Sequence, residues 1–212
     1  MKVIKPYYVI EEEINPQKIM AVIERAGRTC YKSENNISDG SAEKFIGNIL
    51  RSGHESVIEH EKITVRFICD RGVTHELVRH RIASYSQEST RYCNYTNDKF
   101  GNELTFIEPC FWDRSTEEGA KQYKIWEESM QAIEESYNEL ISAGARPEQA
   151  RSILPNSLKT EIVVTMNLRE WRHYFKLRCS KRAHPQIKEI SDMLLAEFKE
   201  KLPVIFGDLN FD

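Results

Sequence analysis

Between residues 79 and 91 the sequence concentrates side chains that bind anions. In order, these are Arg79, His80, Arg81, Ser84, Ser86, Gln87, Ser89, Thr90 and Arg91. Arginine donates paired hydrogen bonds to phosphate and carboxylate groups, and hydroxyl and amide side chains add further donors. The cations alone are also compatible with a solvated basic helix face. The donors that follow them favour a binding site for a phosphorylated ligand.

A second group lies in "NLREWRHYFKLR" (167–178), which predicts a helix with an aromatic side. Arg178 follows Trp171 by seven residues and therefore lies on that side. Its guanidinium either reaches past the aromatic rings to water or is partly desolvated in a pocket. A more polar cluster at the start of the same helix consists of Asn167, Arg169 and His173.

The histidines and cysteines do not predict a metal site or a cysteine nucleophile. His75 and His80 are separated by five residues, whereas a zincin helix requires a separation of four. His54 and His60 flank two glutamates, but histidines in such a setting more often form hydrogen bonds to a loop or a ligand. The five cysteines are scattered, which indicates free thiols in a reducing compartment. The sequence also lacks a glycine-rich dinucleotide or phosphate motif.

The elements that must position these residues alternate between helices and single strands, which predicts one α+β domain over residues 1–212 with a central, mostly antiparallel sheet. Residues 85–103 are expected to form an ordered loop. Ser41, and Ser115 with Glu118, are expected to begin helices, and Gly27 to end one. The predicted helices are 15–27, 41–53, 73–84, 115–144, 147–155, 168–180 and one from residue 185, and the predicted strands are 62–70, 104–109 and 160–168.

The long helix expected at about 115–144 carries apolar residues every three or four positions, which is typical of a seam against another helix in the same chain or in another subunit. The net charge of the chain is −3, which does not favour a long polyanion as partner. No apolar run is long enough to cross a membrane, and the first residues lack a signal-peptide pattern. We therefore expect a cytoplasmic protein that binds neither nucleic acid nor membrane.

Four ordered blocks resemble the flavin-dependent thymidylate synthase family. Arg79-His80-Arg81, seven further residues and Ser89 have the family's signature spacing, and "GHESVIEH" (53–60), "ARSILP" (150–155) and "NLREWRHYFKLR" (167–178) resemble its other blocks. The resemblance implies a methyltransferase that converts dUMP to dTMP for de novo dTTP biosynthesis. It also implies tightly associated FAD, NADPH and 5,10-methylenetetrahydrofolate as co-substrates, and a homotetramer with active sites at the subunit interfaces.

The resemblance also assigns roles to individual residues. Arg178 matches the arginine that activates the uracil. The residues expected to bind FAD are His54, Ser56, Arg79, His80, Arg81, Gln87, Asn167, Arg169 and His173. The residues expected to bind dUMP are Glu76, Arg79, Gln87, Glu88, Ser89, Thr90, Arg91, Arg151 and Arg178.

Three positions depart from the common family pattern. Ser86-Gln87 stands where Asn-Glu is frequent, Glu76 stands where Gln is frequent, and His173 stands where Asn can occur. Two other classes of function remain open from the residues themselves. One is a nucleic-acid-binding module that uses the basic segment 146–182, and the other is a phosphohydrolase that uses His80.

Overall fold

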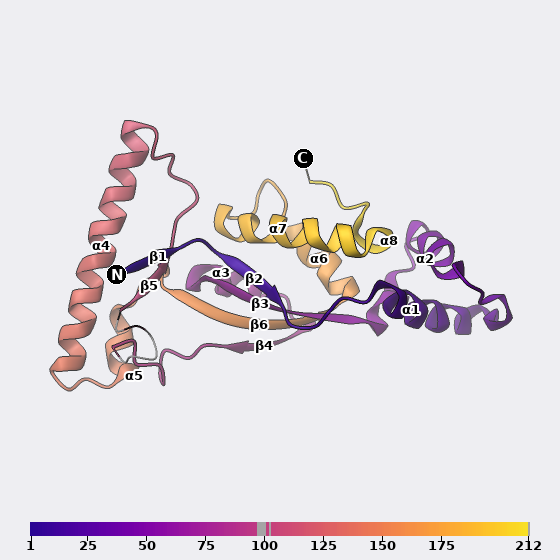
Figure 1. Cartoon of the computed structure of the whole chain (residues 1–212), viewed down its shortest axis with the longest axis horizontal. Coiled ribbons are helices and arrows are strands. Elements are labelled where there is room, and N and C mark those ends of the chain that lie inside the picture. The colour runs from indigo at the N-terminus through magenta and orange to yellow at the C-terminus, as the bar shows by residue number, and fades with distance from the viewer. Residues whose placement is uncertain (97–100, 102, 212) are drawn as a thin grey trace. The chain divides into compact units, whose positions relative to one another are not determined.

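The computed structural model describes residues 1–96, 101 and 103–211 and folds them as an α+β protein (Figure 1). The strands are β1 (Lys2–Ile4), β2 (Tyr7–Ile10), β3 (Lys62–Asp70), β4 (Ala83–Gln87), β5 (Thr105–Ile107) and β6 (Lys159–Asn167). The α-helices are α1 (Pro16–Tyr31), α2 (Ser41–Arg51), α3 (Arg71–Leu77), α4 (Glu117–Ser142), α5 (Pro147–Ala150), α6 (Leu168–Arg178), α7 (Pro185–Lys201) and α8 (Pro203–Phe206). Short 3-10 helices are η1 (Glu34–Asn36), η2 (Glu55–His60) and η4 (Arg151–Ile153).

A four-stranded antiparallel sheet has the strand order β2-β3-β6-β4. Along β6 the side chains alternate between buried and half-buried, because successive side chains of a strand point to opposite faces. The strands predicted near 62–70 and 160–168 are confirmed as β3 and β6, and the mostly antiparallel sheet is confirmed by the direction of its strands. The strand predicted at 104–109 is β5, which pairs in parallel with β1 in a separate two-stranded sheet.

The chain forms two compact units. Unit 1 comprises Met1–Tyr7, Phe67–Arg79 and Ser86–Ile162, and unit 2 comprises Tyr8–Arg66, His80–Tyr85 and Val163–Asp212. Strands β3, β4 and β6 contribute residues to both units. The assignment of residues 1–212 to one domain remains a prediction. Across the part of the chain that the structure describes, no helix is long and apolar enough to cross a membrane.

The core of unit 2 holds α6 in place through aromatic packing. Trp171 is fully buried, and its indole N–H donates to the carbonyl oxygen of Ile63 on β3 at 3.0 Å. The rings of Phe175 and Phe198 join α6 to α7, with centroids 5.3 Å apart. Asn167 begins α6, since its side chain accepts a hydrogen bond from the N–H of Glu170 at 2.8 Å. Packing on one side and a cap at the start therefore fix the position of α6 and the face on which each of its side chains lies.

The apolar seam of α4 is buried within unit 1. Tyr123, Trp126, Met130 and Tyr137 belong to one core cluster that also contains Phe106 of β5. The apolar seam of α4 is therefore covered by residues of the same chain. The sequence alone had allowed either this arrangement or packing against a second subunit. Thr116 begins this helix by accepting from the N–H of Gly119 at 3.1 Å, and the capping box expected from Ser115 and Glu118 is wrong.

Two other predicted helix boundaries are wrong for local reasons. Gly27 does not end α1, which continues to Tyr31; a side chain at Gly27 would collide with the ring of Phe45. The glycine therefore permits close packing of α1 on α2. Gly40, with a positive φ of 73°, occupies the N-cap position of α2 where Ser41 was expected.

The helix predicted at 73–84 is confirmed only as far as residue 77, and its second half is wrong. α3 ends at Leu77, and residues 83–87 form β4 rather than the end of a helix and the start of a loop. Val78 and Ile82 imitate a helical repeat but are exposed at 44% and 67%, whereas His80 between them is buried. The helical spacing of Val78 and Ile82 therefore did not predict which side chain is buried, which is the imidazole of His80. Of the predicted loop 85–103, residues 97–100 and 102 lie outside the described residues.

Candidate active site

The turn after α3 separates the three residues of the Arg79-His80-Arg81 motif. Asp70 begins α3 by accepting from the N–H of Val73 at 2.8 Å. Beyond the helix, Arg79 and Arg81 are exposed, whereas His80 is only 3% exposed. The motif thus provides two surface cations and one buried imidazole.

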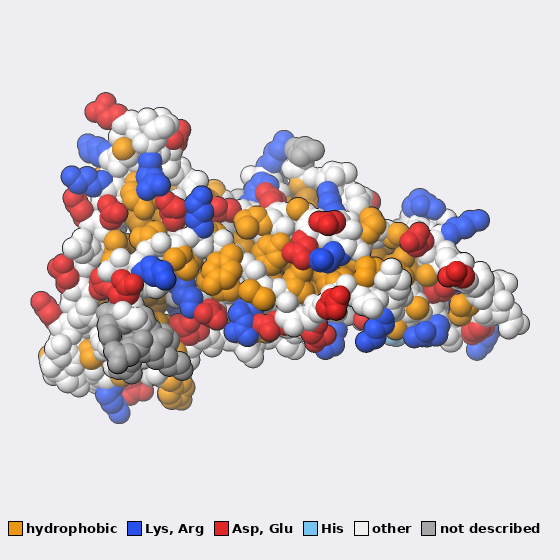
Figure 2. All heavy atoms as spheres, in the orientation of Figure 1, with side chains coloured by type: hydrophobic (Ala, Val, Ile, Leu, Met, Phe, Trp, Pro, Cys, Tyr) orange, Lys and Arg blue, Asp and Glu red, His pale blue; other side chains and the backbone are white. Residues whose placement is uncertain are grey.

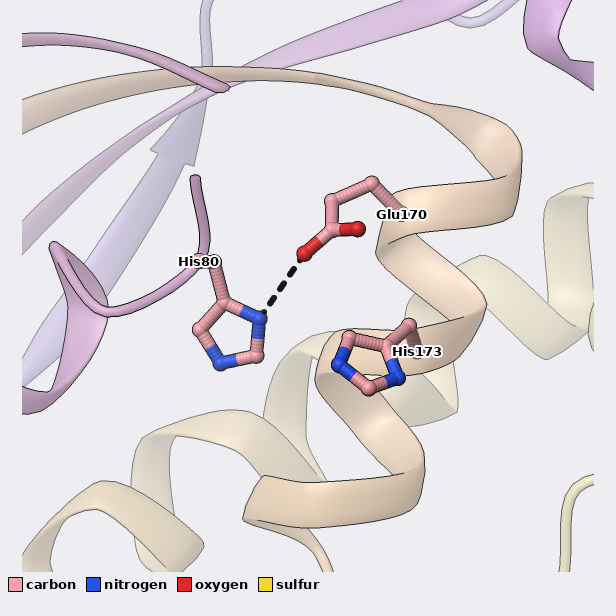
Figure 3. Close-up of side chains that lie close together, drawn as sticks. All are labelled: His80, Glu170 and His173. Atoms are coloured by element: carbon pink, nitrogen blue, oxygen red, sulfur yellow. Dashed lines mark hydrogen bonds and ion pairs between the residues drawn. The ribbon is translucent and has the colours of Figure 1, made fainter. Parts of the chain in front are cut away.

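His80 lies between two charged residues of α6 in unit 2, Glu170 and Arg178. Figure 3 shows the contact with Glu170. Its Nδ1 is 3.0 Å from Oε1 of Glu170, and its Nε2 accepts a hydrogen bond from Nε of Arg178 at 3.2 Å. The ring of Tyr174 packs edge-on against the imidazole, with centroids 5.1 Å apart. The hydroxyl of Tyr85 donates to the backbone oxygen of His80 at 2.6 Å. These contacts hold the imidazole in one orientation.

The hydrogen bonds define the protonation of His80. A guanidinium has no acceptor, so Nε of Arg178 must be the donor and Nε2 of His80 carries no proton. The proton of the neutral ring is then on Nδ1 and is donated to Glu170. Burial, together with the nearby Arg178 and His173, lowers the pKa of His80 to about 4. Burial also raises the pKa of Glu170 above its ordinary value. His80 is therefore neutral at physiological pH.

The spacing of His80, Glu170 and His173 raises the question of a metal centre. Their ligand atoms lie within 4.8 Å of one another. A histidine ligand must offer a ring nitrogen without a proton. In His80 that nitrogen is Nε2, which Arg178 occupies, while Nδ1 carries the proton. This arrangement favours a hydrogen-bond network over a metal centre.

The polar cluster expected at the start of α6 lines a pocket in unit 2. The pocket has a volume of about 490 Å³. Its lining residues are Glu55, Glu59, Ile82, Asn167, Arg169, Glu170, His173 and Lys176. Three residues expected to contact the flavin (Asn167, Arg169 and His173) are therefore brought together.

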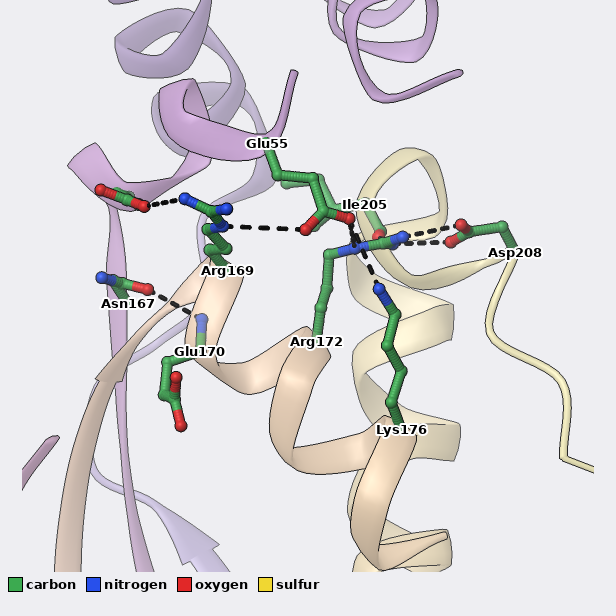
Figure 4. A network of polar contacts seen from close by, with 9 residues as sticks. Glu55, Asn167, Arg169, Glu170, Arg172, Lys176, Ile205 and Asp208 are labelled. Carbon is green, nitrogen blue, oxygen red and sulfur yellow. Dashed lines mark hydrogen bonds and ion pairs between the residues drawn. The ribbon is translucent and has the colours of Figure 1, made fainter. Parts of the chain in front are cut away.

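Two of the three glutamates that line this pocket, Glu55 and Glu59, pair with its cations. Figure 4 shows the contacts of Glu55. Arg169 donates from Nη1 to Oε1 of Glu59 at 2.6 Å. Glu55 lies 3.9 Å from Nε of Arg169 and 3.6 Å from Nζ of Lys176. Sequence reasoning missed both glutamates, although they stand within the "GHESVIEH" block. An anionic ligand that binds Nη1 of Arg169 would therefore compete with Glu59.

His54 and Ser56 flank Glu55 at the start of η2, and both are exposed. Nδ1 of His54 is 3.2 Å from the hydroxyl of Tyr31. Neither residue lines the pocket described above, and their expected contact with flavin remains a prediction.

Most residues expected to bind the nucleotide belong to unit 1. Gln87 donates from its amide to the hydroxyl groups of Thr74 at 3.1 Å and Thr160 at 3.4 Å. Arg151 donates to the hydroxyl of Thr90 at 3.5 Å. The other members of the set are Glu76, Arg79, Glu88, Ser89 and Arg91. Arg79, Arg91 and Arg151 are exposed, so their guanidinium groups are accessible to a ligand.

Glu88 has a structural role that sequence reasoning missed. Its Oε1 accepts from the hydroxyl of Tyr95 at 2.6 Å, and its Oε2 accepts from Nζ of Lys159 at 3.1 Å. Adjacent residues at the end of a strand point to opposite faces, which separates this side chain from that of Gln87. Period-two alternation in 83–88 was the available signal. The Glu88 carboxylate is thus committed to Tyr95 and Lys159.

The fold is an α+β fold that carries a neutral histidine, a pocket lined with cations and exposed arginines, as expected of an enzyme that acts on anionic ligands. The family described as thymidylate synthase complementing protein matches residues 11–204. The flavin-dependent thymidylate synthase of Pyrococcus furiosus is 40% identical over 182 residues, which cover 85% of this chain and 72% of the relative. The corresponding protein of Geobacter sulfurreducens is 37% identical over 195 residues, covering 89% and 81%.

The chain therefore belongs to the flavin-dependent thymidylate synthase family and is a methyltransferase. The fold of this chain also resembles that of a solved structure. The crystal structure of the UMP/dUMP methylase PolB from Streptomyces cacaoi, bound with 5-Br dUMP, superposes with a TM-score of 0.80 at 21% identity. The superposition covers 98% of this chain and 96% of that one.

None of the five cysteines is expected to act as nucleophile. Cys69 and Cys179 are buried, and burial raises the pKa of both thiols, which disfavours the reactive thiolate. The other three cysteines, Cys30, Cys93 and Cys110, lie outside the four sequence blocks that resemble the family. Each single Cys→Ser variant should retain turnover within a few-fold of the parent protein, measured as dTMP formation per bound flavin. A folded, flavin-loaded single variant without turnover would contradict this.

Proposed function

We propose that this protein methylates dUMP to dTMP, with 5,10-methylenetetrahydrofolate as the one-carbon donor and NADPH as the reductant through FAD. The observation that carries the proposal is Arg178, a guanidinium on the aromatic side of α6 that is bonded to a neutral histidine. Membership of the family suggests the reaction, and Arg178 is suited to activating the uracil ring, which is the central step of that reaction.

The residues of the unit 2 pocket fit a flavin. Asn167, Arg169, His173 and Lys176 line one wall and provide amide, imidazole and cationic donors. Such donors suit the diphosphate and the ring carbonyl groups of FAD. The chemistry that FAD supplies when bound is the transfer of reducing equivalents from NADPH. The protein's part is to hold, orient and charge-stabilise the reacting groups.

Arg178 has the properties needed to activate the uracil ring. Its side chain is half-buried next to His80, so its charge is less screened than it would be in water. A guanidinium beside a uracil carbonyl stabilises the anionic ring and increases electron density at C5. Carbon 5 can then bond to the methylene carbon of the folate, with no cysteine adding to C6. The carbon–nitrogen bonds between that methylene and the folate break, and the hydrogen of C5 leaves as a proton.

The exposed arginines of unit 1 suit the phosphate of dUMP. Arg79, Arg91 and Arg151 can each offer a planar pair of donors to phosphate oxygens. Ser89 organises the same loop, because its hydroxyl accepts from the N–H of Arg91 at 3.3 Å and its carbonyl accepts from the N–H of Cys93 at 3.0 Å. The Gln87 amide, which bonds Thr74, fixes the strand that leads into this loop.

Large apolar side chains are exposed next to the site residues in sequence, which supports a homotetramer with sites at subunit interfaces. Val78, Ile82 and Tyr92 are 44%, 67% and 79% exposed. Exposed apolar groups of this kind next to functional residues favour coverage by another subunit. The tetramer would then complete each site with residues from more than one chain.

Mixing two inactive variants tests this assembly. If a site combines residues from different chains, co-refolded Arg81→Ala and Arg178→Ala subunits should regain part of the activity that each lacks alone. The measurement is dTMP formation, with sedimentation velocity on the same samples. A fully active monomer in sedimentation would contradict the assembly.

The rival proposal of nucleic-acid binding receives little support. On the face shown in Figure 2, the basic and acidic side chains of the described residues are interspersed rather than gathered into a basic patch. A chain with net charge −3 also lacks the electrostatic footprint of such proteins.

The decisive experiment is an assay of purified protein with FAD, dUMP, 5,10-methylenetetrahydrofolate and NADPH under anaerobic conditions. We expect a yellow protein, a change in its visible spectrum on addition of dUMP, and dTMP as product. Absence of dTMP with all components present would overturn the proposal. Phosphate release from mononucleotides would favour the phosphohydrolase instead.

A further inference from the structure

Two charged residues of α6 meet on one imidazole. Glu170 and Arg178 are eight residues apart, which places them about 12 Å apart along the helix axis and within about 80° around it. His80 comes from the turn before β4 and contacts both, through Nδ1 to Glu170 at 3.0 Å and through Nε2 to Arg178 at 3.2 Å. Figure 3 shows the imidazole beside α6, with the carboxylate of Glu170 directed at it.

The contact at one end of the imidazole dictates what the other end can do. The Glu170 carboxylate accepts the Nδ1 proton and therefore favours the tautomer in which Nε2 is an acceptor. Only that tautomer can accept from Nε of Arg178. Without an acceptor at Nδ1, the proton can move to Nε2, where it would oppose the Nε–H of Arg178.

We infer that Glu170 is a positioning residue that acts through His80 to orient the guanidinium of Arg178. Fixing Nε fixes the plane of the guanidinium, and with it the direction of both Nη groups, because the group is rigid and planar. Reacting groups that are misplaced by about 1 Å can lose about a hundredfold in rate. The inference rests on the proposed function of Arg178 and adds that Glu170 and His80 orient its guanidinium.

Burial supports a positional role over a solvated ion pair. His80 is 3% exposed and Glu170 is 8% exposed. The groups that face His80 are Glu170, His173, Tyr174 and Arg178 from α6 and Tyr85 from β4. Among these, Glu170 is the carboxylate. No other acceptor of comparable strength contacts Nδ1 among the described contacts.

The test compares Glu170→Leu with Glu170→Gln in the flavin-loaded enzyme. Leu removes the acceptor, whereas Gln keeps an oxygen that can accept from Nδ1. We expect Leu to lower kcat at least tenfold, with the KM for dUMP changed less than threefold, and Gln to recover most of kcat. Ser191→Ala is the matched control: it removes the 2.6 Å hydrogen bond to Tyr174, which packs on the same imidazole, and should leave kcat within a factor of two.

A second measurement determines which ring nitrogen of His80 carries the proton. Nitrogen-15 spectra of labelled histidine should show His80 with its proton on Nδ1 in the parent protein and in Glu170→Gln, and a shift towards the Nε2 proton in Glu170→Leu. Unchanged kcat or an unchanged tautomer in a folded Glu170→Leu protein would overturn the inference. Failure of the parent protein to form dTMP would instead overturn the proposed function, and the spectra remain interpretable in that case.

Discussion

Replacing Arg178 by alanine should abolish nearly all dTMP formation while the protein stays folded and keeps its flavin. Removing one preorganised donor at a developing charge typically costs about 3–4 kcal/mol, or a hundred- to a thousandfold in rate. The flavin should stay bound because the pocket residues Asn167, Arg169 and His173 are unchanged. The measurements are flavin content, the spectral change on addition of dUMP, and turnover on the same preparations.

Two further variants make this result specific. Arg178→Lys should restore little activity, because an ammonium group keeps the charge but lacks the planar pair of donors and the Nε–H that bonds His80. Arg182→Ala removes an exposed arginine a few residues later and should leave turnover unchanged. If Arg178→Ala binds dUMP and turns over normally, the assignment is wrong, and Arg151 or Arg91 becomes the candidate.

The second large effect concerns stability. Arg172 is 4% exposed and lies in the network of Figure 4. It forms two hydrogen bonds to Asp208, at 2.6 and 2.7 Å, one to Glu55 at 3.1 Å, and one to the backbone oxygen of Ile205. The guanidinium thereby fastens the C-terminal segment to α6 and η2 within unit 2.

Arg172→Ala should lower the free energy of unfolding by about 3 kcal/mol, since it leaves buried and half-buried acceptors unpaired. The effect belongs at the lower end of the range for broken buried pairs, because the side chain of Asp208 is 63% exposed and can be hydrated. Urea denaturation followed by circular dichroism measures the change. Lys188→Ala breaks the exposed helical pair with Asp192 and is the control, with an expected loss of about 0.5 kcal/mol or less. Equal losses in the two variants would refute the prediction.

The same network predicts a dependence on pH. Hydrogen bonds from Arg172 hold the pKa of Asp208 below its usual range. A carboxyl group whose pKa is lower in the folded state stabilises the fold above its unfolded pKa, about 3.9, and loses this contribution as the pH falls through the folded value. The difference in stability between the parent protein and Arg172→Ala should therefore shrink below about pH 4.

Much of the fold followed from local patterns in the sequence. Alternation identified β3, the run "TEIVVTMNL" identified β6, and apolar repeats identified the long helix α4 and the last helix α7. What failed was the segment after α3, where Val78 and Ile82 continue a helical spacing. The chain instead leaves the helix at Leu77 and buries His80, and a single sequence does not reveal which polar residue will be buried.

Some residues of the candidate site could likewise be predicted from the sequence, and others could not. The sequence identified Arg178 and the cluster of Asn167, Arg169 and His173, because unusual side chains stood at regular positions on a recognisable helix. It missed Glu170, since an acidic residue in the first turn of a helix is the ordinary result of the helix dipole. The pairing of Glu88 with Lys159 was missed because it joins positions 71 residues apart in the chain.

Glu55 links the stability of the fold to ligand binding in the pocket, two properties that are easier to engineer when they can be changed separately. Its carboxylate contacts Arg172, which anchors the C-terminal segment, and it also contacts Lys176 and Arg169, which line the pocket. A substitution at Glu55 therefore alters heat tolerance and ligand preference together. Libraries that aim to change ligand binding in this pocket should hold Glu55 constant and vary Glu59, which pairs with Arg169 at the exposed edge of the network.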